Sequence, residues 1–515
     1  MQLRACRSRR RMEASLGFGL AARSRAGCLT MTLDELLRIV RSEGRAVRID
    51  SRAVEAGDVF VALKGATCDG HDFIDRALAR GAKYIVCQDN RGMPAGPGGA
   101  SGPARITVQN TAHAAGALAQ AERGNPAARL TNLAVTGTNG KTTVAFLVHA
   151  CIGHAGKKCG LLGTVVYDTG AGITASTLTT PDCLTIAAAQ QQMVQAGAEY
   201  AVLEASSHAL HQDRLAGIDF QAAAFTNLSG DHLDYHRTRE DYLAAKTRLF
   251  AALSPDATAV LNKQAPQSES IARATGARVG WYAVDAPADI TAHIESMTVA
   301  GTKFIVEYRG RKAPVTTPLL GQYNVANHLA AAGLCLAAGF DLETVAAGLS
   351  SLRAIPGRLE KVGGGDPAVI VDYAHTDDAL KNVLATLKPL CEGKLIVVFG
   401  CGGDRDRTKR PRMAQAAERW ANTVVVTSDN PRTEDPQAII RDIMAGFAES
   451  GAVIVEADRK KAIETAIERA EPDDIVLIAG KGHETYQIIG DRKLDFSDRQ
   501  IALQSLRERS CNRSQ

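Results

Sequence analysis

The segment Val135–Thr143 has the residue types of a phosphate-binding loop. It reads Val-Thr-Gly-Thr-Asn-Gly-Lys-Thr-Thr, follows an apolar run and precedes a helical pattern. Backbone N–H groups in a glycine-rich turn, together with the positive end of the next helix, bind phosphate oxygens. Lys141 can reach the outer phosphates of a nucleotide, and the Thr142 hydroxyl can bind Mg²⁺. Because the usual pattern has a further glycine where Val135 stands, we interpret this loop as a shortened variant. The alternative, a glycine turn with an incidental lysine, is disfavoured by the strand–turn–helix context.

A nucleotide loop does not define a reaction, since switches, motors, kinases and ligases share it. Glu204 ends the apolar run Tyr200–Leu203, which is where such folds hold Mg²⁺. The segment Asn227–His236, with two aspartates and two histidines, follows another apolar run. On pattern alone, Glu204 could equally be a charged residue at a strand end that points into solvent. The segment Asn227–His236 fits a polar surface loop as well as it fits a metal or phosphate site. By pattern alone, Lys246 is a solvated lysine on a helix.

Composition argues against two other classes of protein. The 515 residues contain 60 Lys+Arg against 56 Asp+Glu and only 5% aromatic residues, which is too balanced and too poor in stacking side chains for nucleic-acid binding. No apolar run approaches the length of a membrane span, so we expect no membrane insertion. The 11 cysteines are scattered, without a C-x-x-C pair, which indicates free thiols in a reducing compartment. We therefore expect a cytoplasmic protein.

The candidate residues lie on three predicted blocks, 31–129, 130–355 and 356–515. The first has short strands at Val59–Leu63 and Tyr84–Cys87. The second alternates strands and helices from Leu133–Val135 to Thr258–Leu261, which argues for a largely parallel sheet. The third has the clearest alternation and predicts a doubly wound α/β domain, with sites at the carboxyl ends of its strands. Its predicted strands are Val369–Asp372, Leu395–Phe399, Thr423–Thr427, Val453–Glu456 and Ile475–Ile478.

Residues 1–30 differ from the rest of the chain. Their only acid is Glu13, against arginines at positions 4, 7, 9, 10, 11, 23 and 25. The apolar stretch Leu16–Ala22 is short and broken by glycine, so a secretory signal is a weak interpretation; a transit peptide would look somewhat similar. We favour a basic, disordered extension or an early start codon, because Met31 opens a plausible helix at Leu33–Val40.

The order and spacing of G-T-N-G-K-T-T, L-E-A-S-S-H and T-N-L-S-G-D-H-L-D-Y-H resemble the Mur ligase family, and the similarity extends through nearly all of Met31–Arg499. The resemblance implies an α/β protein of three domains: an N-terminal UDP-substrate-binding domain, a central P-loop ATPase domain and a C-terminal Rossmann-like domain. It also implies a two-step reaction. ATP phosphorylates a carboxylate of the nucleotide substrate, and the amine of an amino acid then displaces phosphate from the acyl phosphate.

The resemblance also implies site roles. Two Mg²⁺ ions would be held by Thr142, Glu204, His232 and Lys246, with Lys246 carrying a carbamate derived from CO₂. ATP would contact Gly137, Thr138, Asn139, Gly140, Lys141, Thr142, Thr143, Asn327, Arg358 and Asp372. From the residue pattern alone, without the resemblance, we would interpret Asn327 as a helix cap and Asp372 as a strand-end cap. The UDP-linked muramoyl dipeptide would contact Ser51, Thr179, Thr180 and Ser207. His208 is a candidate general base by position.

The segment Asp429–Arg432 indicates which amino acid is added. Pro431 disfavours helix for Asn430 and fixes an extended turn after an apolar strand. Arg432 can then present its planar donor fork to a carboxylate. Since meso-diaminopimelate has a distal carboxylate that L-lysine lacks, this arginine favours diaminopimelate. D-N-P-R resembles the members of the family that add diaminopimelate to UDP-N-acetylmuramoyl-L-alanyl-D-glutamate. By the same resemblance, the amino acid would contact Arg405, Asp429, Asn430, Pro431, Arg432, Gly480 and Glu484.

Four alternatives stay open. A lysine-adding Mur ligase is the nearest, and it would not depend on Arg432. A folylpolyglutamate synthetase would lack both D-N-P-R and the UDP-type first domain. A P-loop switch or nucleic-acid motor would need a basic groove or partner surface. A degenerate homologue would have lost some of the residues Lys141, Glu204, His232, Lys246 and Arg432, all of which are present.

Overall fold

The computed structural model describes residues 31–65, 68–88, 103–229 and 233–513. The predicted basic extension 1–30 and the predicted metal ligand His232 lie outside these residues. By internal contacts the chain divides into two compact units, Met1–Thr111 and Ala112–Gln515, which are described separately.

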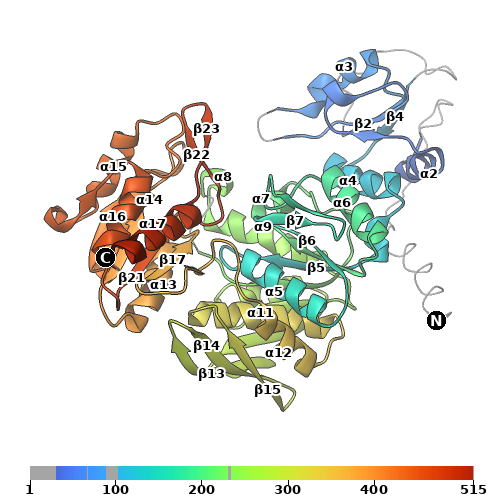
Figure 1. The fold of residues 1–515 in the computed structure, drawn as a ribbon. Coiled ribbons are helices and arrows are strands. Elements are labelled where there is room, and N and C mark those ends of the chain that lie inside the picture. The colour runs from blue at the N-terminus through green and yellow to red at the C-terminus, as the bar shows by residue number, and fades with distance from the viewer. Residues whose placement is uncertain (1–30, 66–67, 89–102, 230–232, 514–515) are drawn as a thin grey trace. The chain divides into compact units, whose positions relative to one another are not determined.

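The first unit is a small parallel α/β sheet (Figure 1). Its four strands follow the order β1 (Val47–Arg48), β2 (Val59–Val61), β3 (Tyr84–Cys87) and β4 (Ala104–Thr107). Its helices are α2 (Leu33–Glu43) and α3 (Ile74–Ala79). Helix α2 begins with a capping box between Thr32 and Glu35 and ends at Gly44, which has φ 65°. The predicted helix after Met31 is thus present.

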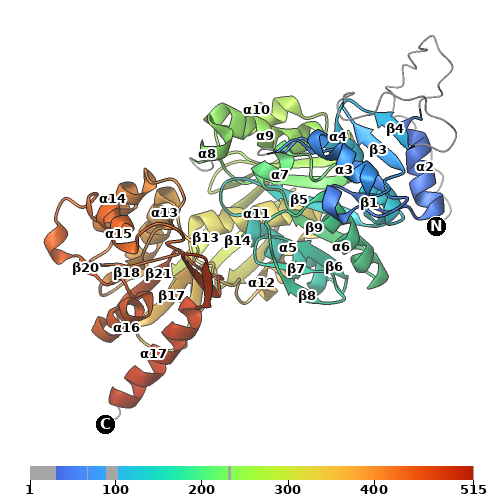
Figure 2. The same ribbon diagram turned by 90° about the horizontal axis from the view of Figure 1, so that it is seen from above.

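An eleven-stranded sheet forms the centre of the second unit (Figures 1 and 2). The strand order is β15-β14-β13-β12-β11-β10-β5-β9-β6-β7-β8. The pairs from β12 to β6 are parallel, whereas β13 to β15 and β6 to β8 pair antiparallel. The bounds are β5 Thr131–Thr136, β6 Cys159–Leu162, β7 Val166–Asp168, β8 Ile173–Ala175, β9 Tyr200–Glu204, β10 Phe220–Phe225, β11 Thr258–Asn262, β12 Arg278–Val284, β13 Ile290–Thr298, β14 Gly301–Tyr308 and β15 Arg311–Thr317.

Helices cover both faces of this sheet. Leu133 and Val135 face a core with α5, α11 and α12, whereas Ala134 faces a core with α6, α9 and α10, as the alternation of side chains along a strand requires. The bounds are α4 Thr111–Glu122, α5 Lys141–His154, α6 Cys183–Gln195, α7 Ser207–His211, α8 Leu233–His236, α9 Arg239–Ala251, α10 Ser268–Ala274, α11 Gln322–Ala337 and α12 Leu342–Ser351.

The third predicted block folds around a six-stranded sheet of order β16-β17-β21-β18-β19-β20, antiparallel only between β16 and β17. Helices α13, α14 and α15 pack on one face, and α16 and α17 lie side by side on the other (Figure 2). The strands are β16 Glu360–Val362, β17 Ala368–Asp372, β18 Leu395–Phe399, β19 Thr423–Val426, β20 Ile454–Val455, β21 Ile475–Ala479, β22 Tyr486–Ile489 and β23 Arg492–Asp495. The helices are α13 Asp377–Leu387, α14 Lys409–Trp420, α15 Pro436–Met444, α16 Arg459–Arg469 and α17 Asp498–Arg513.

A chain of buried amides attaches α4 to the second unit. Gln120 Nε2 donates to Gln190 Oε1 at 2.7 Å, and Gln190 Nε2 donates to Asn132 Oδ1 at 2.9 Å. All three side chains are buried, so each bond satisfies groups that water cannot reach. Helix α4 precedes the predicted boundary at 129/130, yet by contacts it belongs to the second unit.

The predicted α/β class is confirmed. Elements that the sequence analysis did not assign are mainly antiparallel: β13 to β15, and the hairpin β22–β23. These strands carry many polar, half-exposed residues and lack the long apolar runs of the parallel strands. In the part of the chain that the structure describes, no helix combines the length and apolar character needed to cross a membrane.

Candidate active site

The predicted phosphate loop lies between β5 and α5, and its glycines are required by close contacts. A Cβ on Gly137 would lie 1.9 Å from Thr226 Oγ1. A Cβ on Gly140 would lie 2.3 Å from Asn327 Oδ1, and Gly140 has φ 91°. Only glycine fits both constraints at position 140. The contact also places Asn327, from α11, beside the loop, next to the candidate ATP residues.

Two lysines converge on the carbonyl groups of this loop. Lys141 Nζ donates to the carbonyls of Gly137 and Thr138, each at 2.9 Å. Lys246 Nζ donates to the same Gly137 carbonyl at 2.8 Å and lies 4.4 Å from the centroid of the Tyr242 ring. Lys246 is 1% exposed, so its interpretation as a solvated lysine is wrong. Tertiary packing buries this face of α9 against the loop, which the helical pattern does not reveal.

Glu204 lies at the centre of a buried oxygen cluster. Its side chain is fully buried and accepts hydrogen bonds from Thr142 Oγ1 at 3.1 Å, Thr164 Oγ1 at 2.8 Å and Thr164 N at 2.8 Å. One carboxylate with two hydroxyls is the hard-oxygen chemistry that Mg²⁺ prefers, so these residues fit that ion. Among the described residues there is no group of three or more His, Cys, Asp or Glu that could hold a metal. Of the four predicted protein ligands, His232 lies outside the described residues.

The residues predicted to bind the UDP-linked substrate fall in both units. Thr180 Oγ1 donates to the Glu204 carbonyl at 2.6 Å. Thr179 Oγ1 lies 3.1 Å from Thr164 Oγ1 and donates to it, because the single hydroxyl proton of Thr164 is directed to Glu204. This pair of threonines therefore borders the Glu204 cluster. Ser207 is buried, and its hydroxyl has no hydrogen-bond partner in the described part of the chain. Ser51 is buried in a 3₁₀ turn of the first unit.

His208 belongs to an aromatic cluster close to Lys246. Its ring centroid lies 4.1 Å from that of Tyr235 and 5.5 Å from that of His236. Burial, together with the nearby His208, His211 and Lys246, lowers the pKa of His236 to about 4. His236 is therefore neutral at physiological pH.

The third block contributes an arginine to the loop. Arg358 Nη2 donates to Thr142 Oγ1 at 3.3 Å, and its guanidinium lies 4.6 Å from the centroid of Tyr373. The Asp372 carboxylate accepts from the backbone N–H groups of Leu359 at 2.7 Å and Ala374 at 2.8 Å. Burial raises the pKa of Asp372, against the lowering effect of Arg358 and these N–H groups. Asp372 thus fixes the turn that carries Arg358.

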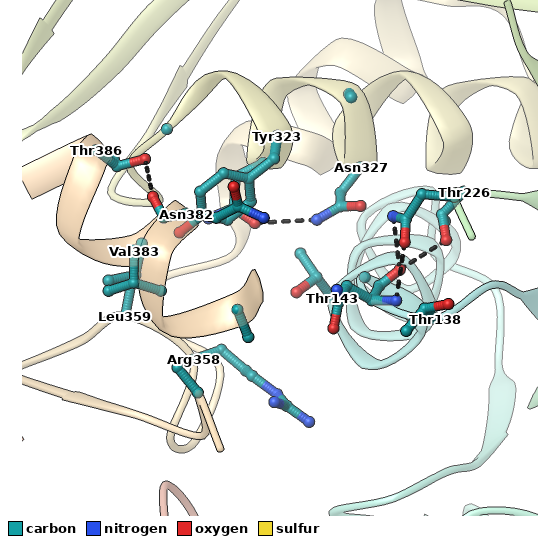
Figure 3. A pocket seen from close by; sticks show the side chains of 18 of the residues that line it. Thr138, Thr143, Thr226, Tyr323, Asn327, Arg358, Leu359, Asn382, Val383 and Thr386 are labelled. Carbon is teal, nitrogen blue, oxygen red and sulfur yellow. Dashed lines mark hydrogen bonds between the residues drawn. The ribbon is translucent and has the colours of Figure 1, made fainter. Parts of the chain in front are cut away.

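A cavity of about 960 Å³ lies against these groups. The phosphate loop, α11 and the third block line it, and Figure 3 shows Tyr323 and Asn327 on α11 and Asn382 and Thr386 on α13. The volume is at the upper end of the range for small-molecule sites. It suits a ligand of nucleoside triphosphate size whose phosphates face the loop.

The predicted amino-acid site forms at the carboxyl ends of β19 and β21. Arg432 has φ 50°, and this conformation is held by the hairpin β22–β23: Arg432 N donates to Ile488 O at 3.1 Å, and Gly490 N donates to Arg432 O at 2.7 Å. Arg432 Nη1 donates to Gly403 O at 2.8 Å. No sequence pattern predicted this hairpin, although it fixes the direction of the arginine.

The other predicted residues of this site lie together. Asn430 Nδ2 donates to Glu484 Oε2 at 2.9 Å. A Cβ on Gly480 would lie 2.6 Å from Asp429 Oδ2, so these two residues are also adjacent. Arg405 is exposed, and a Cβ on Gly402 would lie 3.9 Å from its Cγ and 2.9 Å from Arg432 Nη1. Pro431 O would lie 1.9 Å from a Cβ on Gly403. Residues that the sequence analysis missed are Thr164, Tyr242, Tyr373 and Lys481.

The α/β fold, the phosphate loop and Arg358 from the third block are together the features of an ATP-dependent ligase. The chain belongs to the Mur ligase family. The family models that match are Mur ligase family, catalytic domain, at residues 45–123; Mur ligase middle domain, at 135–335; and Mur ligase, glutamate ligase domain, at 357–482.

Within this family, the most similar proteins reported below carry the name of one particular ligase. The chain is 45% identical over 472 residues to the UDP-N-acetylmuramoyl-L-alanyl-D-glutamate–2,6-diaminopimelate ligase of Geobacillus kaustophilus, covering 90% of this chain and 95% of that one. A solved structure of a ligase with the same name matches with a TM-score of 0.66 and 35% identity, over 90% of this chain and 95% of that one. A Mycobacterium tuberculosis folylpolyglutamate synthase structure shares the fold, with a TM-score of 0.59 and 21% identity over 70% of this chain and 91% of that one.

Proposed function

We propose that this protein catalyses the ATP-dependent addition of meso-diaminopimelate to UDP-N-acetylmuramoyl-L-alanyl-D-glutamate, in cytoplasmic synthesis of peptidoglycan precursors. The observation that carries the choice of amino acid is the Arg432 turn beside the Asn430–Glu484 pair. A guanidinium and a carboxylate at one strand edge match the distal carboxylate and ammonium of diaminopimelate. The names of the similar ligases support the same substrates.

In the proposed first step, ATP occupies the cavity with its phosphates on the loop N–H groups. Lys141 exchanges its loop carbonyls for the γ-phosphate, and Arg358, Asn327 and Asp372 contact or shape the nucleotide site. An oxygen of the D-glutamate γ-carboxylate attacks the γ-phosphorus, the bond to the β-phosphate oxygen breaks, and ADP leaves. The negative charge that builds on these oxygens is stabilised by Lys141 and the loop N–H groups.

In the second step, the amine of diaminopimelate attacks the acyl carbonyl carbon. The carbon–oxygen bond to phosphate breaks with its electron pair, and the nitrogen loses a proton as the amide forms. His208 is the candidate proton acceptor by position. Arg405, Asp429, Arg432, Gly480 and Glu484 would hold the incoming amino acid.

The proposed metal centre has two Mg²⁺ ions, with Thr142, Glu204, His232 and Lys246 as protein ligands. Mg²⁺, when bound, neutralises phosphate oxygens. Lys246 would act as a carbamate: its neutral amine adds to the carbon of CO₂ and releases one proton. This turns a buried cation into an anion able to bind a metal, and the Lys246–Gly137 contact puts it beside the loop.

The nucleotide substrate would contact Ser51 in the first unit and Thr179, Thr180 and Ser207 in the second. The buried Ser207 hydroxyl, which has no partner in the described residues, supports this role because such a group needs a hydrogen bond. We further propose that the domains are 31–129, 130–355 and 356–515, with α4, at the end of the first range, packed on the central domain through Gln120.

The test is phosphate release by the purified protein with ATP, Mg²⁺ and UDP-N-acetylmuramoyl-L-alanyl-D-glutamate, with meso-diaminopimelate or L-lysine offered in parallel. We expect turnover with diaminopimelate only. Turnover with lysine would retain the ligase and contradict the role of Arg432. No turnover with either amino acid would contradict the proposed function.

A further inference from the structure

Lys481 is a fully buried cation next to the proposed amino-acid site. It follows β21, and its side chain is 0% exposed. Its Nζ lies 3.0 Å from Asn430 Oδ1, 3.1 Å from Glu484 Oε2 and 3.9 Å from Asp429 Oδ1. A buried ammonium is costly unless it is paired and hydrogen-bonded. All three of its polar neighbours belong to the proposed diaminopimelate site.

We propose that Lys481 is a positioning residue that sets the selectivity of this site for an amino acid with a distal ammonium. This inference rests on the proposed function. Lys481 acts through the Asn430 amide and the Glu484 carboxylate, which it holds in one arrangement.

The hydrogen-bond chemistry fixes the Asn430 amide in one orientation. An ammonium only donates, so the group of Asn430 that faces Lys481 must be its oxygen. The same Oδ1 also accepts from the backbone N–H of Ile488 at 2.9 Å. Turning the amide over would place its NH₂ group against two donors. Its Nδ2 is therefore directed to Glu484, where it donates to Oε2 at 2.9 Å.

Glu484 is held on one side only. Both Lys481 and Asn430 donate to Oε2, and Oε1 makes no hydrogen bond within the described part of the chain. That second oxygen can accept from a ligand ammonium. Lys481 also separates two carboxylates, Glu484 and Asp429, which would otherwise repel each other across a buried site. Loss of the ammonium should free both Asn430 and Glu484 to rearrange.

The test compares two acceptors, meso-diaminopimelate and 2-aminopimelate, which keeps the chain and the distal carboxylate but lacks the distal ammonium. For each enzyme, kcat/KM is measured with both acceptors. The preference is the ratio of kcat/KM for diaminopimelate to kcat/KM for 2-aminopimelate. In Lys481→Met, we expect this ratio to fall by about tenfold or more, because KM for diaminopimelate rises while KM for ATP is unchanged. A merely structural role would lower kcat/KM for both acceptors alike and leave the ratio intact.

Lys493→Met is the matched control. Lys493 lies 4.0 Å and Lys481 5.5 Å from the centroid of the same Tyr486 ring, but Lys493 is exposed on β23. We expect this control to keep the wild-type preference. Lys481→Gln, which keeps a donor but no charge, is made in parallel in case Lys481→Met does not fold; ATP binding and Tm check both.

The outcomes distinguish failure of the proposed function from failure of the proposal for Lys481. If the wild-type protein does not use diaminopimelate, the proposed function fails before Lys481 is at issue. If it does, an unchanged preference in a folded Lys481 variant overturns the positioning role. Loss of the fold in both variants also overturns it, because Lys481 would then be purely structural. A reduced preference in a folded variant, with the Lys493→Met control intact, supports it.

Discussion

Thr142 Oγ1 lies 3.1 Å from Glu204 Oε2, although 62 positions separate the two residues in the chain. The cause is strand pairing: β5 and β9 are adjacent and parallel, with Val135 opposite Glu204. The carboxyl ends of parallel strands meet at one edge of the sheet, which brings the first turn of α5 to the buried carboxylate.

Replacing Glu204 should impair the use of Mg²⁺. In Glu204→Gln we expect kcat to fall about 100-fold or more, because a neutral amide replaces the buried anion next to Thr142. Phosphate release over a range of Mg²⁺ concentrations measures the effect. Glu199→Gln, an exposed carboxylate paired with Lys157, is the control and should behave as wild type. An unchanged Mg²⁺ dependence in Glu204→Gln would contradict the metal role.

A methyl group on Gly140 should block the nucleotide site. Its Cβ would lie 2.3 Å from Asn327 Oδ1, and alanine at φ 91° adds about 1 kcal/mol or more of backbone strain. We expect Gly140→Ala to weaken ATP binding, measured by calorimetry, by about tenfold or more. Gly153→Ala is the control: Gly153 is exposed near the end of α5, and its Cβ would meet nothing within 4 Å. ATP affinity that is equal in the two variants would argue against the loop's role.

Lys246→Ala should nearly abolish ligation, since the proposed carbamate cannot form. We expect partial recovery on adding short-chain carboxylic acids, which can place an anion in the vacated space. Lys263→Ala, at an exposed lysine that donates to Pro287 O, serves as the control and should need no rescue. Full activity of Lys246→Ala without added acid would rule out the carbamate.

Arg432→Ala should raise KM for diaminopimelate by about 100-fold while leaving KM for ATP unchanged, because a charge-assisted bidentate contact is lost. Alanine adopts φ 50° at much the same cost as arginine, so Tm should change little. Initial rates at varied diaminopimelate provide the measurement. Arg441→Ala, on the exposed face of α15, should have no effect. An unaltered KM for diaminopimelate in Arg432→Ala would contradict the assignment of Arg432 to the diaminopimelate site.

Acid should destabilise the second unit through His328. Burial lowers the pKa of this side chain to about 4, and its Nδ1 bonds to Asn324 O at 2.7 Å. Because the unfolded side chain titrates near 6.5, the unfolded state binds the proton first as pH falls. Stability is therefore full above about pH 6.5 and is reduced by roughly 3 kcal/mol at pH 4.

The measurement is Tm between pH 7.5 and 4.5. His328→Leu should show a shallower loss of Tm over this range than wild type, whereas the exposed His293→Gln should keep the wild-type slope. Parallel slopes in wild type and His328→Leu would show that His328 is not a source of the acid sensitivity.

Local sequence determined much of this protein. Strand–turn–helix patterning predicted the phosphate loop, because glycine spacing and a following helix are properties of neighbouring residues. The strands of the third block were predicted almost one by one: β18 has the predicted bounds, and β17, β19 and β21 each differ from prediction by one residue, since buried parallel strands are apolar runs. The resemblance to Mur ligases, carried by motifs at fixed spacing, is confirmed by the family models.

Tertiary structure alone decided the environment of each polar group. Thr164 contacts Glu204 because β6 and β9 pair, and Lys246 is buried because α9 packs on the loop. Arg432 takes its left-handed conformation from a hairpin more than fifty residues further along the chain, and Lys481 finds Asn430 across the sheet edge. Periodicity reports which face of an element is apolar, but not what lies opposite it. Contacts between distant segments depend on strand order and packing, which no local pattern encodes.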